Sequence, residues 1–405
     1  MITYSLRHLL WEVVLMFLGG AKSRNQMVAE TLRPGFLKTL LELTETEEQS
    51  AAHPDTPYWL LSKLPPVVLV DFSASLIRRL LRMRCLERYR FGTEWLVAVD
   101  GTWLRTYTEP HCEKCLHQQQ SDGSTIWFHA VLEAKLVLGN GMSFSLASVP
   151  IENPGGEYDK QDCEQKAFPR LAEKLKQLYP RLHICLLGDS LYGCAPVLQV
   201  CEKMAWSYIV IFKQGRTPAL WERAERAAAR GPELTEKRRD GTEQVFRWAP
   251  MLNHEGHTLH AIICHEKKPD GETTLWAWLT DHRPTRSNVS TIANKGGRSR
   301  EHIEQQFNIQ KNGEFELKHD YGSNLNAWYN YYLLAQIAHM LVQLMQAGDL
   351  VRRLSDGAHD SFTDAFRTMR NFVVRMRESI QRDRASSRWR GKAVRQIQIR
   401  LLAPT

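Results

Sequence analysis

The chain has 405 residues, which is more than one small module needs and is typical of a large catalytic domain with accessory segments or of two to three domains. Hydrophobic residues make up 43% of the sequence and charged residues 24%, which excludes a mostly disordered chain. The formal net charge of +8 indicates weakly that the chain binds a polyanion.

The positive charge is concentrated at the end of the chain. Residues 352–405 contain 13 Lys and Arg against 5 Asp and Glu, a net charge of +8. The remainder has 53 minus 13, or 40, basic residues and 45 minus 5, or 40, acidic residues, and is neutral. A neutral body with a basic tail favours an enzyme whose tail attracts a polyanion electrostatically. The alternative is a helical tail that is merely solvated.

The sequence predicts neither a membrane span nor a disulfide framework. No apolar run reaches the ~18 residues needed to cross a bilayer. Glu12 interrupts the nearest candidate, residues 9–20, and a poor cleavage site follows it. The eight cysteines show no disulfide pattern. These features favour a reduced, cytoplasmic location.

Residues 1–90 are predicted to be helical because apolar side chains recur at helical spacing. A basic amphipathic stretch at 76–89 presents either a phosphate-binding face or a merely solvated one, so this region is a candidate for DNA binding. Residues 91–212 alternate between short apolar runs and helical patterns, which predicts an α/β layout around one mixed sheet. The predicted strands are 95–99, 126–138, 142–149, 183–187 and 206–212, and the predicted helices are 162–178 and 195–204.

Residues 213–280 have a less regular pattern and are predicted to be a partly β insertion. Residues 281–347 follow with two predicted helices, at 299–311 and 325–345. Residues 348–405 are predicted to form the basic, helical C-terminal tail.

Two aspartates, Asp100 and Asp189, each come at the end of an apolar run predicted to be a strand. Catalytic groups in open α/β sheets gather at strand ends, where the backbone is fixed and side chains converge. Each residue also has an ordinary structural alternative: Asp-Gly is a common turn, and Gly-Asp-Ser is a common N-cap.

A third acid lies on the predicted helix at 299–311. With ~100° per residue, Glu304 and Lys311 fall within about 40° of Arg300, so the acid and both cations share one face. Two aspartates at strand ends and a glutamate on a later helix form a ligand set suited to two Mg²⁺ ions and phosphoryl transfer. Arg300 and Lys311 beside the glutamate are candidates for holding a phosphate diester.

These motifs resemble the Asp-Asp-Glu transposases of bacterial insertion sequences, in the insertion sequence 4 family. The family hallmark is Tyr-x2-Arg-x3-Glu-x6-Lys, and Arg300, Glu304 and Lys311 match its spacing. The segments 97–102 and 187–192 are similar to the family's two Asp motifs, and the resemblance covers roughly residues 95–345. The stretch 160–163 is also similar to this group, and no chemistry is assigned to it.

The resemblance implies an RNase H-like core with a β-rich insertion, which cleaves DNA at transposon ends and joins the 3′ hydroxyl to target DNA. It implies Asp100, Asp189 and Glu304 as catalytic and metal-binding residues, with Mg²⁺ or Mn²⁺, and double-stranded DNA held by Arg300 and Lys311. It also implies a homodimer on DNA. One position departs from the hallmark, because Gly297 stands where the family has Tyr.

Two other functions compete with the transposase hypothesis. The chain is alternatively a domesticated derivative that binds DNA without transposing it, an idea that the Tyr-to-Gly departure supports. It is alternatively an RNase H-like nuclease that never joins strands. Replacing the three acids distinguishes an enzyme from a binding protein, because only an enzyme would lose cleavage while keeping DNA affinity.

A short segment also contains four soft or borderline metal ligands, His111, Cys112, Cys115 and His117. Cys-x2-Cys spacing suits zinc, but most structural zinc sites draw their ligands from two separate segments. The sequence therefore favours an ordinary loop over a zinc site here.

Overall fold

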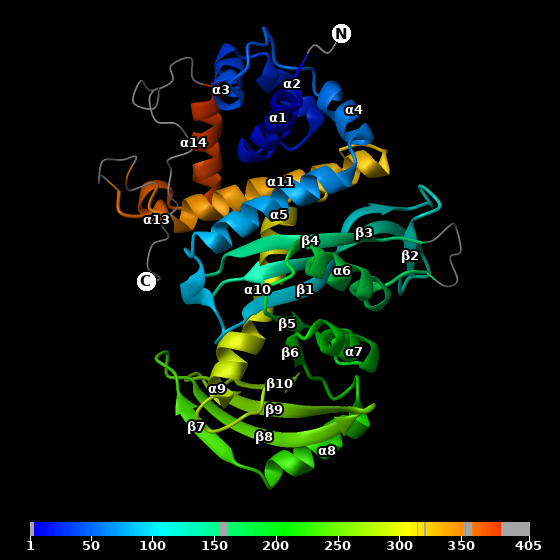
Figure 1. The fold of residues 1–405 in the computed structure, drawn as a ribbon, viewed down its shortest axis with the longest axis vertical. Coiled ribbons are helices and arrows are strands. Elements are labelled where there is room, and N and C mark those ends of the chain that lie inside the picture. The colour runs from blue at the N-terminus through cyan, green and yellow to red at the C-terminus, as the bar shows by residue number, and fades with distance from the viewer. Residues whose placement is uncertain are drawn as a thin grey trace. The chain divides into compact units, whose positions relative to one another are not determined.

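The computed structural model describes residues 4–153, 161–313, 315–319, 321–350, 353 and 359–381. Its described residues form two compact units, divided at residues 86/87 and 304/305. We call residues 87–304 the sheet unit, and residues 1–86 with 305–405 the helical unit. The fold is mixed α/β, with one ten-stranded mixed sheet flanked by helices (Figure 1).

The sheet unit contains all ten strands in the order β2-β3-β1-β5-β6-β10-β9-β8-β7, with β4 paired to β3. The β1–β5 and β5–β6 pairs are parallel, and the others are antiparallel. The strands are β1 (Trp95–Tyr107), β2 (Leu116–Gln119), β3 (Thr125–Val137), β4 (Ser143–Ile151), β5 (Ile184–Gly188), β6 (Ser207–Ile211), β7 (Glu233–Lys237), β8 (Glu243–His254), β9 (His257–Lys267) and β10 (Thr273–Thr280).

The centre of the sheet forms where the sequence is continuously apolar. All five residues of β5 are buried, as are the first five residues of β1, because strands covered on both faces exclude water from every side chain. The predicted strands at 126–138 and 142–149 are joined by a hairpin turn at 139–141, with Gly141 in the left-handed region at φ +86°.

The strand β1 is longer than predicted. It continues past Asp100 to Tyr107, paired with β3 along its length. A β-bulge interrupts this pairing: Trp103 faces Ala130, while Arg105 faces His129. The bulge inserts one extra residue into β1, so the two strands lose register by one position there.

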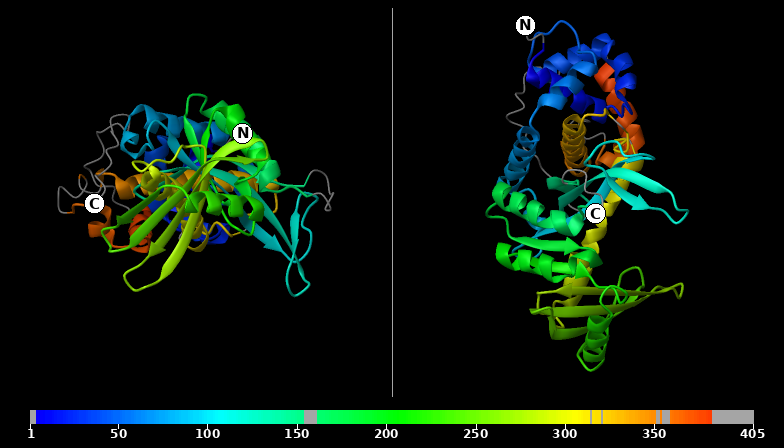
Figure 2. Two further views of the ribbon diagram at one scale, coloured as in Figure 1. Left: turned by 90° about the horizontal axis from the view of Figure 1, so that it is seen from below. Right: turned by 90° about the vertical axis from the view of Figure 1, so that its right-hand side faces the viewer.

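The helices of the sheet unit pack against the strands. They are η1 (Glu87–Tyr89), α6 (Glu164–Leu178), η2 (Ser190–Tyr192), α7 (Ala195–Met204), α8 (Pro218–Ala229), α9 (Val289–Thr291), the π-helical turn η3 (Ile292–Gly296), η4 (Gly297–Arg300) and the start of α10 (Glu301–Asn312). Apolar residues of α6 at spacings of three and four are buried against β3 and β4. Figures 1 and 2 show α6 and α7 lying side by side.

The predicted insertion at 213–280 extends the central sheet. The strands β7 to β10 form an antiparallel series, and α8 packs on β8 and β9. The last strand of the series, β10, pairs with β6 through Leu279 and its neighbours. The insertion therefore shares a continuous hydrogen-bonded sheet with the predicted core.

Two glycines allow the helical stretch before α10 to lie very close to the sheet. A Cβ on Gly296 would lie 2.4 Å from the Ile209 side chain, and one on Gly297 would lie 2.2 Å from Nε1 of Trp278. Gly297 occupies the position where the resemblance expects Tyr, and the buried Trp278 indole leaves no room there for any side chain. The departure from the hallmark therefore has a packing cause in this chain.

The helical unit contains α1 (Leu6–Leu18), α2 (Arg24–Thr31), α3 (Pro34–Thr44), α4 (Asp55–Lys63), α5 (Pro66–Arg82), the rest of α10, α11 (Leu325–Ala347), α13 (Phe362–Phe366) and α14 (Met369–Gln381). The predicted helix at 325–345 is confirmed as α11. It is buried on nearly all sides, which is typical of a core helix. Asn330 on α11 donates hydrogen bonds to the carbonyls of Leu61 and Leu64 and so holds the end of α4.

Part of the predicted basic tail is packed in this unit. The helix α14 buries Phe372, Val373 and Ile380, and Arg377 donates hydrogen bonds to the carbonyls of Gly19 and Gly20. Residues 382–405 of the predicted tail lie outside the described residues. The exposed arginines on and after α5 leave the DNA-binding prediction for the stretch 76–89 open.

No single helix in the described part of the chain is long and apolar enough to cross a membrane. The neighbouring helices α4 and α5 pass a test of length and composition only when taken together, and they meet at an angle of 94°.

The close packing at Gly297 predicts the effect of adding one methyl group. Gly297→Ala is expected to lower the free energy of unfolding by about 1–3 kcal/mol, because the Cβ overlaps the Trp278 ring. Gly215→Ala is the control and should change it by no more than about 0.5 kcal/mol, since a Cβ there meets nothing within 4 Å. Adding Trp278→Phe to Gly297→Ala should recover part of the loss in a double-mutant cycle measured by denaturant unfolding. Equal stability of Gly297→Ala and wild type would contradict this account.

Candidate active site

Asp100 and Asp189 lie next to each other because their strands are parallel neighbours. The β1–β5 pairing places Ala98 opposite Leu187. Asp100 and Asp189 each come two residues after this last pair, and the charge of Asp189 raises the pKa of Asp100, so the two carboxylates lie near each other. Both aspartates thus lie near the C-terminal end of β5, and their shared role as metal ligands stays a prediction.

The two aspartates reach this position in different ways. β5 ends at Gly188, and the Asp189 side chain accepts a hydrogen bond from the Leu191 backbone N–H at 2.8 Å, which caps η2. The N-cap alternative for Asp189 is thus confirmed, and it fixes the carboxylate. The prediction that the strand ends at Asp100 is wrong: this residue lies in mid-strand, where β3 still pairs with β1 but β5 has ended.

Arg300 joins Asp100 to Glu304. The Arg300 Nη2 atom lies 3.1 Å from Asp100 Oδ1, and its Nη1 atom pairs with the Glu304 carboxylate one helical turn away. The Arg300 side chain is only 7% exposed, whereas the Glu304 side chain is 51% exposed. A buried guanidinium therefore holds an acid of the sheet and an acid of α10 together.

A fourth acid, Glu164, belongs to the same cluster and was missed by the sequence prediction. It is the first residue of α6, and it accepts a hydrogen bond from the Tyr192 hydroxyl at 3.0 Å and another from the Gly101 backbone. A Cβ on Gly101 would lie 2.2 Å from the Glu164 carboxylate, so only glycine permits this approach. Successive strand residues face opposite sides, so Glu164 and Arg300 approach β1 from opposite faces.

The glycines in the two Asp motifs are the sequence feature that could have indicated a nearby side chain such as that of Glu164. Gly101 makes room for its carboxylate, and Gly188 makes room for Tyr192, since a Cβ on Gly188 would lie 2.7 Å from that ring. The stretch 160–163, which is similar in sequence to the insertion sequence 4 family, ends directly before Glu164. Sequence alone does not show that the start of α6 packs beside Gly101.

The electrostatics of this cluster are dominated by negative charge. Burial raises the pKa of Asp100 to about 7, against the opposing effect of Arg300, and the charges of Glu164, Glu304 and Asp189 raise it further. Burial also raises the pKa of Glu164, against the hydrogen bond from Tyr192. Two carboxylates pair with the one guanidinium, and the charges of Glu164 and Asp189 also act on Asp100, an arrangement that a bound cation would stabilise.

Lys311, predicted to share a face with Arg300 and Glu304, lies further along α10, in the helical unit. Its Nζ atom is 6.0 Å from the centre of the Phe307 ring. The roles of Lys311 and Arg300 in holding DNA stay predictions. In the described structure, Arg300 is already engaged by two carboxylates.

The predicted group of soft ligands is only partly assembled. Cys112 and Cys115 lie close together, but the histidine beside them is His129 of β3. The ring of His111 stacks on Tyr107, and that of His117 packs on Trp127. The sequence prediction missed His129 because it is brought to the cysteines by sheet pairing.

The chain matches no family model and no curated protein.

The raised pKa of Asp100 predicts how the stability of the metal-free protein depends on pH. The folded-state pKa is about 7 against an ordinary value of 3.8, so between these values the folded protein binds the proton more tightly than the unfolded chain does. The free energy of unfolding should therefore fall as the pH rises through this window.

Asp100→Asn removes this titration. In the presence of a chelator, the variant should gain stability relative to wild type as the pH rises from about 4 to about 7, by a few kcal/mol at most, at about 1.4 kcal/mol per pKa unit. Asp71→Asn, the same change at an exposed position of α5, is the control. Parallel stability curves for wild type and Asp100→Asn would contradict the raised pKa.

Proposed function

We propose that the chain is a DNA transposase of the Asp-Asp-Glu type, which cleaves DNA at transposon ends and transfers the 3′ hydroxyl to target DNA. The observation that carries the proposal is the ion-paired bridge from Asp100 through buried Arg300 to Glu304, beside Asp189. These acids are 89 and 115 positions apart in the sequence (189 minus 100; 304 minus 189). A merely solvated helix face gives no reason for Glu304 to meet an acid of the central strand.

The topology supports an RNase H-like core. With the short β2 set aside, the strands β4-β3-β1-β5-β6 form a continuous part of the sheet, and among these five only β3 runs antiparallel to the others. Asp100 is in the first of these strands, Asp189 follows the fourth in chain order, and Glu304 is on a later helix. This is the order that the resemblance to the insertion sequence 4 family implies.

The donor set of the cluster fits Mg²⁺, which prefers carboxylate oxygens. Burial, and after it the charges of the neighbouring acids, disfavour the ionised form of Asp100, and a divalent cation would stabilise that form. Asp100, Asp189 and Glu304 are the residues that would hold the ions. Bound there, two ions would activate the attacking oxygen and stabilise the leaving oxygen in phosphoryl transfer.

The remaining residues orient these acids. The cap on η2 fixes Asp189, and Arg300 fixes Asp100 relative to α10. Tyr192 donates to Glu164, which in turn accepts from the Gly101 backbone next to Asp100, so we assign Glu164 as a positioning residue. Because Glu304 is half exposed, its carboxylate can turn from Arg300 towards a cation without exposing a buried group.

DNA as substrate and a homodimer on DNA are parts of the same proposal. A cleft of 250 Å³ begins at Glu164 and Gly101 and continues past Trp103, whose ring is partly exposed and stacks on Phe128. An exposed aromatic ring in a cleft that Glu164 also lines offers a stacking surface for an unpaired base.

Glu304→Gln tests the catalytic proposal. The change keeps the volume of the side chain but removes a charge from the metal site, so Mg²⁺-dependent strand cleavage should fall by about 1,000-fold or more. Glu301→Gln, the same change on the same helix, should stay within about twofold of wild type. Affinity for DNA ends, measured by fluorescence anisotropy, should be kept in both variants.

The other outcomes of these assays distinguish the competing functions. Equal cleavage by Glu304→Gln and wild type would overturn the assignment of this helix. Wild type that binds DNA ends without cleaving them would support the domesticated binding protein, and cleavage without strand joining would support the nuclease.

Glu164→Gln tests the positioning role separately. If Glu164 orients the backbone beside Asp100, the Mg²⁺ concentration for half-maximal cleavage should rise about tenfold, as found when partners of metal ligands are replaced. Glu173→Gln, further along α6 and exposed, should leave it unchanged. An unchanged Mg²⁺ requirement in Glu164→Gln would remove this residue from the site.

A further inference from the structure

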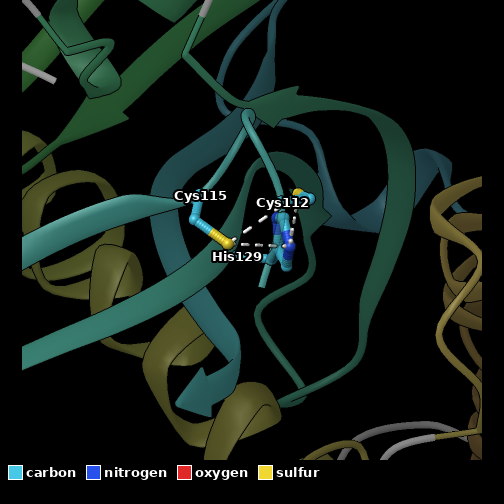
Figure 3. A group of neighbouring side chains, drawn as sticks. All are labelled: Cys112, Cys115 and His129. Atoms are coloured by element: carbon cyan, nitrogen blue, oxygen red, sulfur yellow. Dashed lines mark hydrogen bonds between the residues drawn. The ribbon is translucent and has the colours of Figure 1, made fainter. Parts of the chain in front are cut away.

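Three soft ligands from two segments of the sheet unit converge at one point. Cys112 and Cys115 come from the connection between β1 and β2, and His129 comes from β3 (Figure 3). The two Sγ atoms are 3.8 Å apart, and each lies 3.5 Å from Nε2 of His129. Three donor atoms therefore form a nearly equilateral triangle.

The size of this triangle matches a tetrahedral zinc ion. With Zn–S of about 2.3 Å and Zn–N of about 2.0–2.1 Å, tetrahedral angles separate two sulfurs by about 3.8 Å and a sulfur from a nitrogen by about 3.5 Å. All three observed separations agree with these values. The sulfurs are too far apart for a disulfide, which needs about 2.05 Å.

We propose that Cys112, Cys115 and His129 bind a zinc ion, which clamps the β1–β2 connection onto β3. The proposal does not depend on the proposed transposase activity. It draws its ligands from two segments, as structural zinc sites commonly do, and this removes the objection that the sequence raised to a zinc site within a single loop. The fourth tetrahedral position is assigned to water, on the side of the partly exposed Cys112.

Neighbouring residues that are not proposed as ligands hold the two cysteines and the histidine in place. Cys115 and His129 are buried, and Asn153 donates to the Cys115 carbonyl at 2.7 Å. The Tyr107 ring meets His129 edge-on and stacks on His111. A site whose ligands are pre-oriented binds metal with a smaller ordering cost.

Two alternative explanations of the cluster are weaker. A redox-active Cys-x2-Cys pair would not need an imidazole nitrogen equidistant from both sulfurs. The second group of metal-ligand types in the described residues, Glu94 with Cys185 and His282, is different in kind. There, His282 lies 3.3 Å from the Glu94 carboxylate, an ion pair that explains the grouping without a metal.

The test is the metal content of the purified 405-residue chain, measured by elemental mass spectrometry. We expect about one zinc per chain, which exhaustive chelation removes and added Zn²⁺ restores. After dialysis, the zinc content should be lower than in wild type by about tenfold or more in each of three variants, Cys112→Ser, Cys115→Ser and His129→Gln. Cys163→Ser, at an exposed thiol, and His111→Ala are controls that should keep it.

Cobalt supplies a readout that does not depend on stability. Co²⁺ in the zinc-depleted protein should give the visible bands of a tetrahedral thiolate site, and Cys112→Ser should weaken its sulfur-to-metal absorption while the folded state, followed by circular dichroism, is kept. The proposal is overturned if wild type contains no zinc and binds no cobalt, if a Cys112–Cys115 disulfide is found instead, or if the ligand variants hold as much zinc as Cys163→Ser.

Discussion

The buried guanidinium of Arg300 is the constraint on which the candidate active site depends. A desolvated cation is costly unless it is paired, and its two partners belong to different parts of the sequence, the strand β1 and the helix α10. Satisfying both partners fixes the distance between sheet and helix. Gly296 and Gly297 make this distance attainable, because any larger residue would hold the helical stretch away from β6 and β10.

The cluster around Arg300 is only partly neutralised by that one cation. Asp189 is restrained by the backbone at the end of β5, and Glu164 by Tyr192, so neither acid can move away to relieve repulsion. The fold thereby maintains an excess of negative charge on rigid elements, at the cost of a destabilised Asp100. Such sites are typical of places where function, not stability, selects the residues.

Much of the sheet and part of the site could be predicted from the sequence, for identifiable reasons. Continuous apolar runs produced β5 and the first half of β1, and the register of parallel neighbours brought Asp100 to Asp189. The second half of β1 was missed because its polar residues lack a strand-like alternation. Glu164 and His129 were missed because each meets its cluster through packing or pairing between distant segments, which spacing along the chain does not encode.

The β-bulge in β1 connects the two clusters of the sheet unit. From Asp100 to Arg105 the strand advances five residues, while its partner β3 advances four, from Glu133 to His129. Without the extra residue, alternation would turn Arg105 to the opposite face from Asp100; with it, both lie on the face that Glu133 and His129 share. The bulge thus acts as a spacer of fixed length between the acids and the cysteine–histidine cluster. A single insertion or deletion between residues 100 and 105 would rotate one cluster out of alignment with the other, although neither had lost a ligand.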